Sequence, residues 1–133
     1  MVLFALGLAK LLLYVIVCMQ APRMLRIAPL NRASFALSWA IVRMGLGLLV
    51  AYPVFLLVAF AQSHGAPFES SYTIVLLGAR IALWFFVCRV ILSRHPASAP
   101  GRVWPWVALG VCASFVIDGL AYFAGAENFK FFC

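Results

Sequence analysis

The stretch Leu46–Phe60, with the sequence LGLLVAYPVFLLVAF, decides the fold class of this chain. It contains no charged residue and no alternation of apolar and polar positions, so it lacks the pattern of a membrane-barrel strand. It forms the centre of an apolar run, residues 36–62, in which Arg43 is the one charged residue. Since about 20 helical residues cross a hydrocarbon core about 30 Å thick, this run predicts a transmembrane helix.

Three other apolar runs occupy most of the remaining chain. Together the four runs predict helices at residues 2–20, 36–62, 72–93 and 103–124. The 133 residues are 67% hydrophobic with a mean hydropathy of +1.11, and the connections are too short to form domains of their own. We therefore predict an all-α fold: a polytopic membrane protein in which a four-helix transmembrane bundle is one membrane-embedded domain, residues 1–133.

The positive charges of the connections all lie in the first and the third of them. The first contains Arg23, Arg26 and Arg32. The third contains Arg94 and Arg102, whereas the second has neither Lys nor Arg. By the positive-inside rule, the first and third connections face the cytoplasm and both termini face the opposite side. The net charge of +7 thus reflects topology rather than nucleic-acid binding, and we expect a multi-pass protein of a bacterial inner membrane.

Basic residues at the cytoplasmic boundary are candidates for contact with anionic lipid headgroups. Arg43 is included, because it lies only about 11 Å inside that boundary and a long side chain can extend to the lipid phosphates. The predicted headgroup contacts are Arg23, Arg26, Arg32, Arg43, Arg94 and Arg102. We therefore expect the protein to contact the lipid bilayer, including anionic lipids, and we do not expect it to bind nucleic acid.

Three charged residues, Lys10, Arg80 and Asp118, lie at one depth within the predicted spans. At about 1.5 Å per residue, each is roughly 9 to 12 Å from the non-cytoplasmic boundary. We expect Asp118 to pair with Arg80, because an isolated charge in hydrocarbon is costly and their helices share a short connection. Two interpretations of Lys10 stay open. In the first, its side chain extends outward to the headgroups. In the second, Lys10 and Arg80 share one acid, and the excess positive charge receives an anion or a partner's acid.

Small residues spaced four apart predict where helices pack closely. Gly47 with Ala51, and Gly110 with Ser114, form such pairs, which let two helix backbones approach each other. We expect these faces to offer close packing to a neighbouring helix, including one from a second copy or from another membrane protein.

Residues at the start of the second and fourth apolar runs are candidates for a helix cap and for anchors at the membrane interface. Ser34 is expected to cap the second helix at its N-terminus. Trp104 and Trp106, at the start of the fourth run, fit the aromatic belt at the membrane interface.

Residues for catalysis or metal binding are sparse. The four cysteines show no CxxC spacing, and His64 and His95 lie in connections on opposite sides of the membrane. We therefore predict no metal and no cofactor. We do not favour an enzyme as the interpretation of this sequence.

The pattern favours a small integral membrane subunit or interaction protein that acts through assembly with itself or with a larger membrane partner. Two alternatives stay open: a small homo-oligomeric channel or transporter for an ion or anionic solute, and a membrane enzyme acting on a lipophilic substrate. A channel requires polar residues repeated along one helix face, and each span has only one or two charges.

Overall fold

The computed structural model describes residues 2–95 and 102–123. Within these ranges the chain forms four helices and no strand: α1 (Val2–Met24), α2 (Arg32–Ser63), α3 (Phe68–Arg94) and α4 (Val103–Phe123). Each helix is long and apolar enough to cross a membrane. The predicted all-α fold with four membrane-length helices is confirmed.

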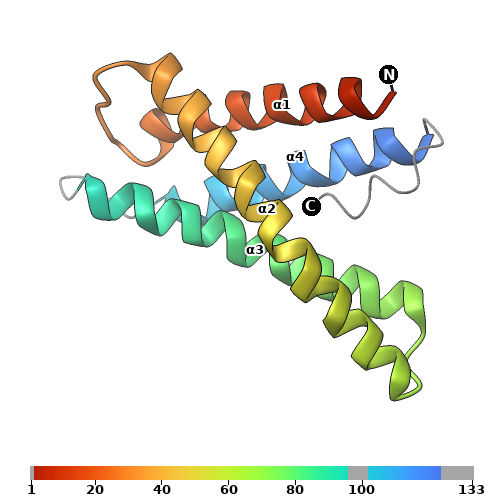
Figure 1. Ribbon diagram of the computed structural model, residues 1–133. Coiled ribbons are helices and arrows are strands. Elements are labelled where there is room, and N and C mark those ends of the chain that lie inside the picture. The colour runs from red at the N-terminus through yellow and green to blue at the C-terminus, as the bar shows by residue number, and fades with distance from the viewer. Residues whose placement is uncertain (1, 96–101, 124–133) are drawn as a thin grey trace.

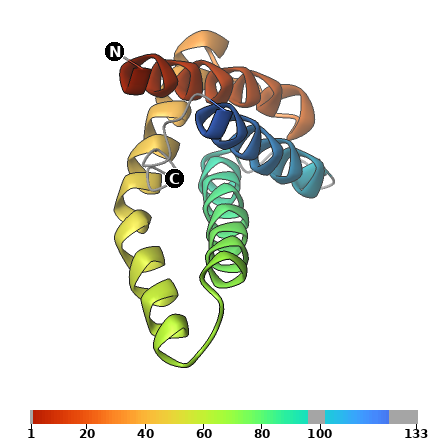
Figure 2. The same cartoon turned by 90° about the vertical axis from the view of Figure 1, so that its right-hand side faces the viewer.

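The helices pack in a closed order in which each contacts the next in sequence and α4 returns to α1. α1 and α4 lie side by side and run in opposite directions, while the α2–α3 hairpin crosses them (Figures 1 and 2). The start of α1 and the end of α4 lie on one side of the molecule, and the α1–α2 connection and the end of α3 lie on the other (Figure 1). Residues near the start of α1 and the end of α4 therefore come to the same level.

Two helices begin earlier than the apolar runs indicate: α2 begins at Arg32 instead of residue 36, and α3 at Phe68 instead of residue 72. The cap of α2 is Asn31 rather than Ser34. Asn31 Oδ1 accepts hydrogen bonds from the backbone N–H groups of Ala33 and Ser34 at 3.0 and 3.2 Å. An apolar run marks the part of a helix that fits the hydrocarbon, and the polar first turn of α2 lies before that part.

The connection between α1 and α2 closes one end of the bundle. Leu25 and Ile27 are buried in the core, whereas Arg23 and Arg26 are exposed. Arg26 has a φ of 53°, in the left-handed region, and this reversal turns the chain between the two buried residues. The connection thus packs its apolar side chains inward and presents its arginines outward.

The α2–α3 hairpin is covered by α1 and α4 over only part of its length. The 32 residues of α2 extend about 48 Å. The buried residues in its first half are Ala36, Ala40, Arg43 and Gly47. From residue 48 to residue 63, only Val54 and Val58 are buried. We call residues 48–79 the distal limb, and Figure 2 shows its turn lying well beyond α1 and α4.

Candidate functional site

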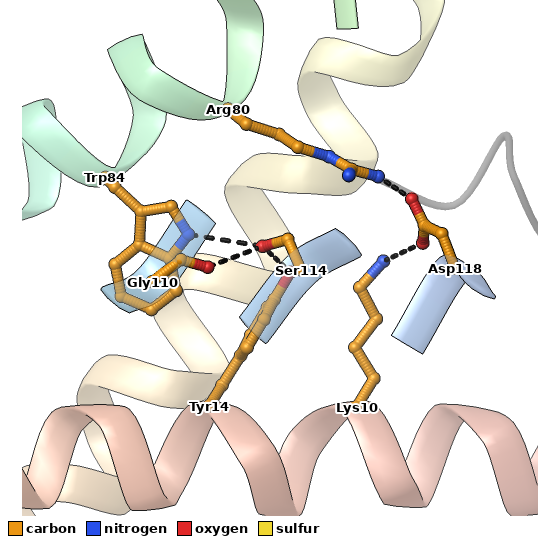
Figure 3. Close-up of polar contacts among 7 residues, drawn as sticks. All are labelled: Lys10, Tyr14, Arg80, Trp84, Gly110, Ser114 and Asp118. Atoms are coloured by element: carbon orange, nitrogen blue, oxygen red, sulfur yellow. Dashed lines mark hydrogen bonds and ion pairs between the residues drawn. The ribbon is translucent and has the colours of Figure 1, made fainter. Parts of the chain in front are cut away.

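A charged layer forms where α1, α3 and α4 bring Lys10, Arg80 and Asp118 together (Figure 3). The Arg80 guanidinium makes a salt bridge with Asp118 Oδ2, so the predicted ion pair is present. Lys10 Nζ lies 3.9 Å from Asp118 Oδ1, and Lys10 is only 3% exposed. The interpretation that Lys10 extends outward to the headgroups is therefore wrong. The second carboxylate oxygen of Asp118 attracts the ammonium group inward.

A hydrogen-bonded layer centred on Ser114 lies one turn of α4 away from Asp118 (Figure 3). Ser114 Oγ donates to the Gly110 carbonyl at 2.9 Å and accepts from Trp84 Nε1 at 3.3 Å. Since the Ser114 proton is already donated, the Tyr14 hydroxyl, 3.0 Å away, is the donor to the same oxygen. Tyr14, Trp84 and Ser114 are fully buried, and this network satisfies their polar atoms where water is excluded.

A spacing of four residues on three helices builds these two layers. The pairs are Lys10 and Tyr14 on α1, Arg80 and Trp84 on α3, and Asp118 and Ser114 on α4. Residues four apart lie on one face of a helix, about one turn from each other. Because α4 runs opposite to α1, the charged members meet at one level and the hydrogen-bonding members meet at the next (Figure 3).

Gly110 permits the close approach of Trp84 to α4. A Cβ atom at position 110 would overlap the Trp84 indole ring. Trp84 also meets Tyr14 and Trp106 edge to face, with ring centroids 5.3 and 5.2 Å apart. The Gly110–Ser114 face is therefore a packing face, but contacts within the chain occupy it and it is not available to a partner.

Arg43 is the fourth charged residue of the core, and it comes from α2. Its guanidinium carbon lies 5.4 Å from the centroid of the Tyr14 ring and 5.2 Å from that of Trp84. Arg43 is 0% exposed, so its assignment to the lipid headgroups is wrong for this structure. Attraction between a cation and two aromatic faces holds the side chain inside the bundle.

The two tryptophans at the start of α4 have different environments. Trp104 is 65% exposed and stacks on Phe85, as expected for the interface. Trp106 is fully buried, and its Nε1 donates to the Val17 carbonyl at 3.1 Å. The prediction that Trp106 belongs to the interfacial belt is therefore wrong. Its position two residues from Trp104 turns it toward α1 and α3 instead of toward the surface.

The other predicted headgroup contacts all lie on the surface. The exposed residues are Arg23, Arg26, Arg32, Arg94 and Arg102. Contact of this group with anionic lipid stays a prediction. The second predicted packing pair lies partly inside the chain, with Gly47 buried and Ala51 half-buried.

The described core combines three cations, Lys10, Arg43 and Arg80, with the single carboxylate of Asp118. The described residues contain no group of three or more His, Cys, Asp or Glu that could hold a metal ion. Comparison with protein-family models, curated proteins and solved structures gives no match. The chemistry that this arrangement offers is electrostatic: buried positive charge, one shared carboxylate, and aromatic rings around them.

Sequence reasoning missed the buried aromatic residues Tyr14, Trp84 and Trp106. A signal for two of them was present, because Tyr14 follows Lys10 by four residues and Trp84 follows Arg80 by four. A charge that must face the interior fixes the inward face of its helix, so the residue one turn later is also inward. Trp106 has no such charged neighbour on α4 to mark its direction.

We expect Ser114→Ala to reduce the free energy of unfolding by about 2 kcal/mol, because the Tyr14 hydroxyl and the Trp84 N–H lose their shared acceptor inside the core. Titration with a denaturing detergent, followed by circular dichroism, measures the loss. Ser93→Ala is the matched control, since the exposed Ser93 hydroxyl only donates to the Val90 carbonyl. Equal losses in the two variants would contradict the role of Ser114.

Proposed function

We propose that this chain is a small integral membrane subunit or interaction protein that acts through assembly with itself or with a larger membrane partner. The four apolar helices fit a small membrane protein. The observation that supports assembly is the distal limb. There the second half of α2 buries only Val54 and Val58, while α1 and α4 cover the other end of the hairpin. Two helices alone bury few of each other's side chains, and a further helix packed beside the limb would bury more of them.

The surface of the limb has the residues that favour helix association in a membrane. Lipid tails are as apolar as leucine, so close packing rather than hydrophobicity selects a partner helix. Gly78 and Ala82, four residues apart on α3, are both exposed, and a Cβ on Gly78 would meet no atom within 4 Å. On α2, Tyr52 and Phe60 are 69% and 64% exposed. We propose that a partner helix packs along this part of the hairpin, next to Gly78 and Ala82.

The alternatives receive less support from the core. The rings of Tyr14, Trp84 and Trp106 fill the middle of the bundle and are fully buried, so a water path through one protomer would have to displace them. For a transporter, the path would have to form between protomers. For an enzyme, Asp118 would have to act as an acid or base while it pairs with Arg80 and Lys10.

The orientation belongs to the same proposal. The exposed arginines of the first connection would face the cytoplasm and meet anionic headgroups, and both termini would face the opposite side. A bacterial inner membrane is the location that we propose.

We expect Gly78→Leu to shift the assembled protein toward the monomer by at least tenfold in dissociation constant, because the leucine side chain separates the packed backbones. Light scattering of the protein in mild detergent, across a dilution series, measures the mass. Gly7→Leu is the matched control, since position 7 on α1 also has no atom within 4 Å of a Cβ but lies away from the distal limb. A monomeric wild type, or equal effects of the two substitutions, would overturn the proposed assembly surface.

A further inference from the structure

We propose that Arg32 and Arg94 form a discrete binding site for one anionic phospholipid, at the edge where α2 begins and α3 ends. The expected ligand is a lipid of the phosphatidylglycerol class, in which the phosphate has no ammonium group beside it. This site rests on the contact with anionic headgroups proposed above, and it does not depend on assembly through the distal limb.

One face of α2 leads from the headgroup level into the hydrocarbon. Arg32, Phe35 and Trp39 are spaced three and four residues apart, so they lie on this face, one turn after another. Arg32 comes before the apolar run that begins at residue 36, whereas Trp39 lies about 10 Å further along the helix. The face therefore places a cation at the polar boundary and an indole ring, which suits the membrane interface, just below it.

The end of α3 packs against the same face. The Arg94 guanidinium carbon lies 5.5 Å from the centroid of the Trp39 ring, and the His95 ring meets Phe35 edge to face with centroids 6.2 Å apart. Arg32 and Arg94 thus flank the contact between Phe35 and His95, one from each helix. Attraction to the indole face restrains the Arg94 side chain, so less conformational freedom is lost when it binds a phosphate.

The acids of the described ranges do not neutralise the two arginines. Both arginines are exposed, and neither forms a salt bridge with another described residue. Glu69 lies in the first turn of α3 and Arg94 is its last residue, so about 37 Å of helix separates them. Asp118 pairs with Arg80 and Lys10 inside the core. Two exposed cations at the membrane boundary therefore favour an anion from the bilayer.

The side chains, rather than the backbone at the start of α2, are the groups that suit a phosphate. Asn31 Oδ1 already accepts hydrogen bonds from the N–H groups of Ala33 and Ser34, which would otherwise face an anion. Guanidinium groups bind phosphate oxygens through charge-assisted hydrogen bonds.

An apolar surface continues from the arginines into the hydrocarbon. Val42 and Leu49 follow Trp39 on the same face of α2, at spacings of three and seven residues, and they are 44% and 73% exposed. Acyl chains can lie along these side chains while the phosphate lies between the arginines. A phospholipid fits both parts of this edge, whereas a soluble anion fits only the first.

Spin-labelled lipids measure which headgroup lies at this edge. The full chain is reconstituted in phosphatidylcholine vesicles with a small, equal mole fraction of either phosphatidylglycerol or phosphatidylcholine that has a doxyl group near the top of one acyl chain. The doxyl group quenches the emission of a nearby tryptophan. In a Trp104→Phe background, Trp39 is the reporter, because Trp84 and Trp106 are fully buried.

We expect the phosphatidylglycerol label to quench Trp39 with an apparent affinity at least about tenfold higher than the phosphatidylcholine label, because two cations attract the anionic lipid. Arg94→Gln and Arg32→Gln should each lower this preference about fivefold, while Arg94→Lys, which keeps the charge, should retain most of it. Arg23→Gln is the matched control, since Arg23 is exposed at the same end of the molecule but belongs to α1 (Figure 1). Its preference should stay within about twofold of the wild type.

Equal quenching of the wild type by the two labels would overturn this site alone, since Trp39 would still face lipid. Quenching by neither label would also contradict the proposed contact with headgroups. Equal losses in Arg23→Gln and Arg94→Gln would show a diffuse positive surface instead of a discrete site and would overturn the proposal. Both arginines of the site are exposed, so the variants should fold, and circular dichroism checks this. A monomeric protein that keeps the lipid preference would overturn the assembly proposal alone.

Discussion

Asp118→Asn is expected to reduce the free energy of unfolding by about 3 to 5 kcal/mol. The substitution preserves the size of the side chain but removes the negative charge that Arg80 and Lys10 share. Both cations then remain 3% exposed or less in the interior, where water cannot replace the carboxylate. Detergent-induced unfolding in mixed micelles, followed by circular dichroism, measures the loss.

Glu69→Gln is the control for this change. Glu69 is an exposed acid in the first turn of α3, where its charge interacts with the helix dipole and forms no salt bridge with another described residue. Its loss should cost less than about 1 kcal/mol. If Asp118→Asn is no more destabilising than Glu69→Gln, the carboxylate of Asp118 does not neutralise a buried charge.

Gly110→Ala is expected to reduce the free energy of unfolding by about 1 to 3 kcal/mol, and Gly110→Leu by more. The added Cβ overlaps the indole ring of Trp84. Trp84 has no open side to which it can move, because it contacts Tyr14 and Trp106 edge to face and Arg43 lies against its ring. The same detergent titration measures the loss, and a red shift of tryptophan emission would report that the ring has moved.

Gly45→Ala is the matched control for Gly110. Position 45 is also inside a helix, but a Cβ there meets no atom within 4 Å. Alanine favours a helix by about 1 kcal/mol relative to glycine, so this variant should be neutral or slightly stabilised. Similar behaviour of the two variants would show that Trp84 does not pack on the α4 backbone.

The membrane spans and the main ion pair could be predicted from the sequence. An apolar run long enough to cross the hydrocarbon has few alternatives, and a charge inside such a run needs a partner at its own depth. Counting residues from the ends of the apolar runs was therefore sufficient to predict that Arg80 and Asp118 lie at the same depth and pair. The helix ends were less predictable, because Arg32 and Phe68 begin helices before the apolar runs do.

The inward faces of the helices could not be predicted in the same way. A soluble helix shows its buried face by its apolar stripe, but a membrane helix is apolar on every side. The environments of Arg43 and Trp106 were therefore assigned wrongly, since each had a plausible place at the membrane boundary. Only tertiary packing shows that the rings of Tyr14 and Trp84 enclose Arg43 and that Val17 accepts the hydrogen bond of Trp106.

The most direct measurement of the buried charged layer is a double-mutant cycle between Arg80 and Asp118. The free energy of unfolding is determined for the wild type, for Arg80→Gln, for Asp118→Asn and for the double variant, under one detergent condition. The salt bridge inside the bundle predicts that the double variant loses at least about 1 kcal/mol less than the sum of the two single losses. Losses that add to within about 0.5 kcal/mol would show that the two residues do not interact, and would contradict the account of the core.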